Sequence, residues 1–166
     1  MKIAFLVYSS GISGGLNVIM EHARAMSVNG ISVYIINVNP RDSNLPEWHH
    51  HYSNIKILNK KDGVAQSYDV VISTFWKTCI EMLHFEATHY VYFNQSVESR
   101  FYKDVNVSRL ADLTYLFGSY VITEATWIKK YLQDNYSINA FLVRNGINKD
   151  IYSEYLENRP INNGLF

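Results

Sequence analysis

Short apolar runs that alternate with amphipathic stretches are the feature of this sequence that most restricts its fold. The run 2–8 (KIAFLVY) is almost continuously apolar, and the next stretch places Leu16, Ile19 and Met20 at helical spacing. Continuous apolar strands are typical of parallel sheets that are buried on both faces. The alternation therefore predicts an α/β fold, a Rossmann-like open parallel sheet with helices on both faces. The predicted strands are 2–8, 31–38, 55–58, 69–75, 88–94, 120–124 and 139–146, and helical stretches follow the first strand and surround 79–83, 107–117 and 125–136.

Charge and cysteine content exclude several classes of protein. The chain has 166 residues with 15 basic and 15 acidic side chains, so its formal net charge is zero and no nucleic-acid partner is expected. The single cysteine, Cys79, cannot form an internal disulfide, and it is expected to be a small core residue on a helix. No apolar run approaches the roughly 20 residues of a membrane span, and the first apolar run is too short for a signal peptide. These features predict a cytoplasmic protein.

The glycine-containing segment 9–23 (SSGISGGLNVIMEHA) lies between the first predicted strand and the first predicted helix. Backbone N–H groups at the start of a helix favour an anion, and Gly14 and Gly15 would let a phosphate or a sugar ring approach closely. The glycine spacing is not that of a dinucleotide-binding fold, no acidic residue ends the second strand (IINVNP), and no P-loop lysine follows. NAD and ATP binding of those types are therefore disfavoured, and no cofactor is expected. A tight turn that binds no ligand remains the alternative.

A second candidate binding segment, 92–102 (YFNQSVESRFY), follows the fifth predicted strand. Asn94, Gln95, Glu98 and Arg100 stand there among aromatic residues. Amides and carboxylates supply hydrogen bonds to hydroxyl-rich ligands, and aromatic faces supply apolar contact. Ligands bind at the carboxyl ends of parallel strands, which is where both candidate segments lie. A solvated loop anchored by its aromatic side chains is the alternative.

Three consecutive histidines, His49–His51, stand in the irregular segment 39–54, which is expected to be a surface loop. Three successive side chains do not easily converge on one ion, and no cysteine or carboxylate spacing supports a site. No metal is therefore expected. The isolated histidines His22, His84 and His89 are expected to be structural.

The order of these motifs resembles the N-terminal half of GT-B-fold glycosyltransferases, in particular the large retaining family 4. The resemblance begins with segment 2–35, where a strand, a Gly-Gly loop, an amphipathic helix and a G-x-x-V sequence follow one another. Segment 141–152 (FLVRNGINKDIY) resembles the family sequence that closes this half. Segments 92–102 and 110–132 are similar to a subset typified by rhamnosyltransferases of bacterial surface polysaccharides. Gln95, Glu98, Phe101 and Tyr102 match the Q-x-x-E-x-x-F-Y pattern of that subset.

The resemblance implies a transferase that moves a sugar from a nucleoside-diphosphate sugar to a saccharide or lipid-linked acceptor, with peripheral contact to the inner face of the membrane as an open possibility. It implies a domain over 1–152 and a linker over 153–166 that leads toward a C-terminal donor-binding domain. The family has its nucleotide-sugar site in that second domain, so no turnover is expected from this chain alone. A histidine that many members have near the position of Gln95 is absent. The residues implied to line the substrate cleft are Gly14, Gly15, Asn94, Gln95, Glu98, Arg100, Thr123, Glu124, Asn145 and Gly146, and no catalytic residue is assigned.

Two other functions compete with this one. The first is a stand-alone, non-catalytic sugar- or nucleotide-binding module with the same fold. The second is a NAD-dependent enzyme, which the glycine spacing and the sequence IINVNP already disfavour.

Overall fold

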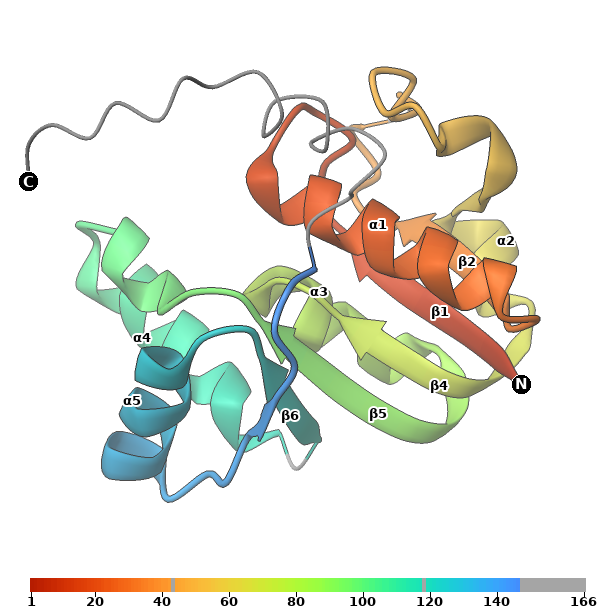
Figure 1. Ribbon diagram of the computed structural model, residues 1–166. Coiled ribbons are helices and arrows are strands. Elements are labelled where there is room, and N and C mark those ends of the chain that lie inside the picture. The colour runs from red at the N-terminus through yellow and green to blue at the C-terminus, as the bar shows by residue number, and fades with distance from the viewer. Residues whose placement is uncertain (43, 118, 147–166) are drawn as a thin grey trace, which may run out of the picture.

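The computed structural model describes residues 1–42, 44–117 and 119–146 and contains a seven-stranded sheet in which every pair of neighbouring strands is parallel (Figure 1). The strand order is β3-β2-β1-β4-β5-β6-β7. This confirms the predicted α/β class and the Rossmann-like open parallel sheet. The strands are β1 (Lys2–Val7), β2 (Ser32–Asn37), β3 (Lys56–Asn59), β4 (Ser67–Ser73), β5 (Glu86–Asn94), β6 (Tyr120–Thr123) and β7 (Phe141–Leu142).

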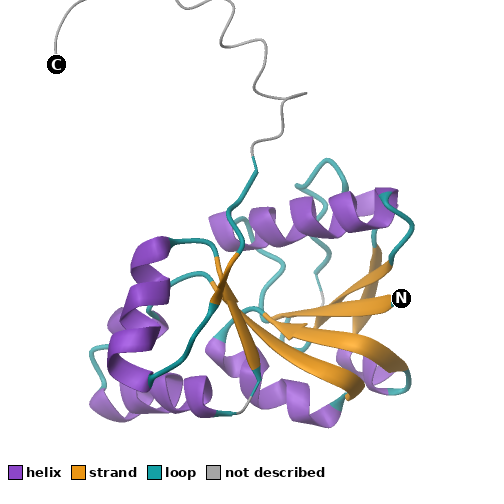
Figure 2. Cartoon of the chain, turned by 60° about the horizontal axis from the view of Figure 1, so that its bottom comes forward, coloured by secondary structure: helices purple, strands orange, loops and turns teal. Residues whose placement is uncertain are grey.

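Helices cover both faces of the sheet, as Figure 2 shows. In β1, Ile3 and Phe5 pack in one apolar cluster with α1, whereas Ala4 and Leu6 pack in a second cluster on the other face. Successive side chains of a strand point to opposite faces, so a strand buried on both faces must be apolar throughout. The helices are α1 (Gly14–Val28), α2 (Lys60–Val64), α3 (Trp76–Glu81), α4 (Val105–Leu113) and α5 (Thr126–Tyr136), with 3₁₀ turns η1 (Tyr52–Asn54), η2 (Met82–His84), η3 (Glu98–Phe101) and η4 (Thr114–Leu116).

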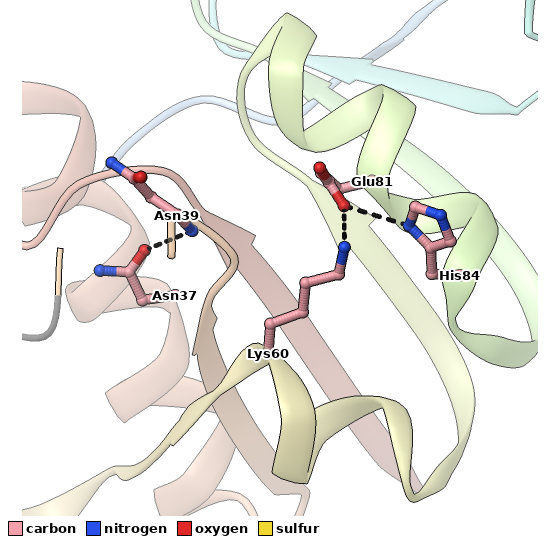
Figure 3. A network of polar contacts seen from close by, with 5 residues as sticks. All are labelled: Asn37, Asn39, Lys60, Glu81 and His84. Atoms are coloured by element: carbon pink, nitrogen blue, oxygen red, sulfur yellow. Dashed lines mark hydrogen bonds and ion pairs between the residues drawn. The ribbon is translucent and has the colours of Figure 1, made fainter. Parts of the chain in front are cut away.

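Among the α-helices of residues 1–42, 44–117 and 119–146, α2 is the one that the sequence pattern does not predict. Asn59 caps it through a hydrogen bond from Asp62 N to Asn59 Oδ1 at 3.0 Å. Lys60 at its start pairs with Glu81 at the end of α3, and His84 Nδ1 lies 3.1 Å from the same carboxylate (Figure 3). Five residues are too few to show a helical period, so the apolar pattern carries no signal for this helix.

Several predicted boundaries differ from the observed ones. Strand β7 has two residues, Phe141–Leu142, where the pattern predicted a strand over 139–146. Residues 147–152 of the predicted domain and the predicted linker 153–166 lie outside the described residues. Cys79 is fully buried in α3, as expected, and burial raises the pKa of its thiol to about 12. Within the described ranges, no helix has both the length and the apolar character that crossing a bilayer requires.

Candidate functional site

A cavity of about 680 Å³ lies where the strand order of the sheet reverses direction. The chain leaves β1 toward β2 and β3 on one side, and β4 starts a run on the other side. The loops after β1 and β4 therefore diverge, and in open parallel sheets ligands bind in the crevice at this point. The cavity is lined by the last residue of β1 and by residues that follow β1, β4, β5 and β6. They are Val7, Tyr8, Ser9, Ser13, Gly14, Gly15, Leu16, Val18, Ile19, Thr74, Phe75, Gln95, Ser96, Glu98, Phe101 and Glu124.

Gly14 and Gly15 form the start of α1 at this cavity. Ser13 caps the helix, because its Oγ accepts a hydrogen bond from Leu16 N at 3.2 Å. Neither glycine has the positive φ that would require glycine; among the described glycines that conformation belongs to Gly30. A Cβ at Gly14 would meet no atom within 4 Å, and one at Gly15 would lie 3.5 Å from the Gln95 amide. Gly14 therefore leaves open space beside the helix start, Gly15 allows the Gln95 amide to lie close to the backbone, and backbone strain explains neither glycine.

The cavity wall combines polar groups with aromatic rings. Gln95 and Glu124, both predicted, line it, and both are partly exposed. Tyr8, Phe75 and Phe101 also line it, although none of them is among the residues that the resemblance implies for the substrate cleft, and Phe101 is 65% exposed. Tyr8 directly follows β1 and Phe75 is the second residue after β4, and this position near a strand end is the signal that could have found them. This mixture offers hydrogen bonds at the edges and flat apolar surface for stacking.

Glu98 belongs to the buried inner wall of the cavity, and it is 3% exposed. Its Oε2 accepts hydrogen bonds from Trp76 N at 2.6 Å and from the Tyr92 hydroxyl at 3.0 Å. Burial raises the pKa of this carboxyl to about 7, and the two hydrogen bonds oppose the rise. Glu98 thus binds the start of α3 and a side chain of β5, whereas the resemblance implied that it lines the substrate cleft.

Asn94 and Thr123 are neighbours on the adjacent strands β5 and β6. The register pairs them directly, and both are completely buried. Among the described residues no hydrogen bond reaches the Thr123 hydroxyl, whereas the Asn94 side chain interacts with the Tyr115 side chain. They are outside the set of lining residues, so they do not face the cavity in this structure.

The remaining predicted residues divide between the rim of the cavity and a surface outside it. Glu124 accepts a hydrogen bond from Asn145 Nδ2, and Asn145 Oδ1 lies 3.4 Å from His22 Nε2 on α1. These contacts connect the end of β6 with the segment after β7 and with α1. Gly146 is exposed beside Asn145. The Arg100 guanidinium instead lies 5.0 Å from the centre of the Tyr131 ring on α5, and it does not line the cavity.

A second cavity, of about 810 Å³, lies at the carboxyl ends of β2 and β3. Its charged groups are largely engaged within the chain. The Asp42 carboxylate accepts from Ser10 N at 2.7 Å, and Lys60 pairs with Glu81 as Figure 3 shows. Asn37 Oδ1 accepts from Asn39 N at 3.0 Å. Because these groups already stabilise the local structure, the cavity beside α1 is the better candidate site.

The three consecutive histidines converge on one carboxylate. The expectation that three successive side chains do not come together is therefore wrong. Glu21 Oε1 on α1 lies 3.7 Å from His49 Nε2, 3.4 Å from His50 Nε2 and 3.9 Å from His51 Nε2. His49 is 2% exposed, so this part of the segment is not a simple surface loop, and burial lowers the pKa of its imidazole. The carboxylate comes from a helix far away in sequence, so spacing alone could not reveal it.

The fold and the position of the cavity define the class of this protein: an α/β protein with an open parallel sheet and a ligand-sized cavity at the switch point of that sheet. Comparison with models of known protein families finds none that matches the chain. Comparison with curated proteins finds no significant match either.

Proposed function

We propose that the cavity binds a sugar and that the chain is the N-terminal domain of a glycosyltransferase. The enzyme would transfer a sugar from a nucleoside-diphosphate sugar to a saccharide or lipid-linked acceptor in cell-surface polysaccharide synthesis. The observation that carries this proposal is the pair Gly14 and Gly15 at the cavity, which have ordinary helical backbones: the space beside Gly14 is open, and Gly15 lies next to the Gln95 amide. Omitting two side chains where no strain requires it is a reason to expect close approach by a ligand.

The chemistry of the wall supports a sugar over a purely apolar ligand. The Gln95 amide and the Glu124 carboxylate present donors and acceptors, while Tyr8 and Phe101 present ring surface. The start of α1, a 15-residue helix, points backbone N–H groups toward this space and favours a negatively charged neighbour such as a phosphate. In sugar transfer such groups position the substrates and stabilise the departing diphosphate.

The test is saturation-transfer NMR with the 166-residue chain and separate samples of UDP, GDP, dTDP, NAD and the methyl glycosides of rhamnose and glucose. We expect contact with a glycoside and weak or absent contact with nucleotides. Gly15→Trp fills the cavity and is expected to abolish that contact. Ala25→Trp, on the exposed side of the same helix, is the matched control and is expected to preserve it.

Two outcomes contradict the proposal. Tight NAD binding, or strong nucleotide binding by this chain alone, would identify a complete nucleotide-binding module. Glycoside contact that survives Gly15→Trp would place the sugar elsewhere on the molecule.

A further inference from the structure

The cluster of Glu21 with His49, His50 and His51 lies outside the cavity and has no part in the proposed function. Glu21 belongs to α1, and the histidines belong to the segment between β2 and β3. The ligand atoms of Glu21, His50 and His51 all lie within 4.8 Å of one another. Two imidazoles and a carboxylate at such distances are a ligand set for a divalent transition metal.

The backbone explains how consecutive histidines can face the same way. In an extended strand successive side chains would alternate, but here the chain turns. Tyr52 N donates to His49 O at 3.0 Å, and His51 N donates to His49 Nδ1 at 3.2 Å. The rings of His49 and His50 stack with centroids 4.5 Å apart, and those of His50 and His51 lie 3.9 Å apart.

We propose that Glu21, His50 and His51 bind a divalent transition-metal ion, with Zn²⁺ as the reference ion. Zinc bonds to imidazole nitrogen and carboxylate oxygen are about 2.0–2.1 Å long, so tetrahedral ligand atoms lie about 3.3 Å apart. The observed separations from Glu21 Oε1 to His50 Nε2 and His51 Nε2 are 3.4 Å and 3.9 Å. Small side-chain rotations bring the three atoms to coordination distance.

His49 is a neighbour of this site and is not one of its ligands. Its Nδ1 accepts the His51 backbone N–H, so in the neutral ring Nε2 carries the proton. That N–H faces Glu21 Oε1 at 3.7 Å. Three protein ligands leave a coordination position for water, and solvent reaches the site because the His50 side chain is 45% exposed.

A bound ion would fasten the segment after β2 to α1. Trp48 Nε1 already donates to Ser10 O at 2.8 Å, so this segment also contacts the glycine-containing loop. The ion would add a second attachment at Glu21, which lies within α1. Because metal binds to the folded arrangement of these side chains, it is expected to stabilise the native state.

The test is isothermal titration calorimetry of the 166-residue chain with ZnCl₂, after purification without a polyhistidine tag and treatment with EDTA. We expect one saturable site, and at least about tenfold weaker binding in His50→Ala, His51→Ala and Glu21→Gln. His84→Ala is the matched control, because His84 also pairs with a glutamate, Glu81, but without a second histidine. Its affinity is expected to equal that of the wild type.

A second measurement keeps the proposal falsifiable if a variant folds poorly. Zinc-edge X-ray absorption of the loaded wild-type chain is expected to show nitrogen and oxygen ligands at about 2.0–2.1 Å, including two imidazoles. Absence of saturable Zn²⁺ binding by the wild-type chain overturns the proposal. Unchanged affinity in a folded His50→Ala/His51→Ala double variant, with folding checked by circular dichroism, overturns it as well.

Discussion

The inner wall and the rim of the cavity each contain a glutamate, and the two carboxylates have different surroundings. Glu98 in the inner wall is 3% exposed and accepts hydrogen bonds from Trp76 N and the Tyr92 hydroxyl. Glu124 at the rim is partly exposed and accepts from Asn145. Burial therefore makes Glu98 part of the framework that shapes the cavity, whereas Glu124 is available to an incoming ligand.

The largest expected effect is on stability and comes from the inner wall. Glu98→Ala would leave the buried Trp76 N–H and the buried Tyr92 hydroxyl without their acceptor. Leaving one buried polar group unsatisfied costs about 1–3 kcal/mol, so we expect a loss of about 2–4 kcal/mol in the free energy of unfolding. Urea denaturation at about pH 5, where the Glu98 carboxyl is protonated, measures it. A loss below about 0.5 kcal/mol would show that Glu98 does not stabilise this wall.

The second prediction concerns pH. The pKa of Glu98 is raised to about 7 in the folded protein, so the folded state holds this proton more tightly than the unfolded state does. The contribution to stability is fully present below the unfolded pKa, near 4.3, and is lost as pH rises to about 7. The loss is at most about 3.5 kcal/mol, since one pKa unit corresponds to about 1.4 kcal/mol.

Glu98→Gln, which resembles the protonated acid, tests this pH dependence. The difference in unfolding free energy between about pH 5 and about pH 8 is expected to be smaller in Glu98→Gln than in the wild type. Urea denaturation of both proteins at both pH values measures it. Equal pH dependence in the two proteins would assign the effect to other groups.

The smallest expected effect on stability comes from the rim. Glu124→Gln retains a side-chain oxygen that can accept from Asn145, and the position is partly exposed. The unfolding free energy is expected to change by less than about 0.5 kcal/mol. The saturation-transfer signal of a bound glycoside is expected to weaken, because a ligand would meet an amide in place of a carboxylate. A large loss of stability with unchanged ligand contact would remove the distinction between rim and inner wall.

The sequence by itself determined the class of fold and the edge of the sheet where the cavity lies. Apolar runs such as 2–8 are local patterns, and burial on both faces of a strand requires them. The placement of Gly14 and Gly15 between a strand and a helix was also local, and the structure puts both at the cavity. The short helix α2 was not predicted, because five residues are too few to show a helical period of apolar residues.

Only the tertiary structure decided which polar groups meet. Glu98 reaches Trp76 N because the loops after β4 and β5 lie side by side, and Glu21 reaches three histidines because α1 packs beside the segment after β2. Both carboxylates find partners that are distant in sequence, and no local period encodes such pairs. The environment of a charged group, and with it the pKa of Glu98, follows from burial and neighbours, which exist only once the chain has folded.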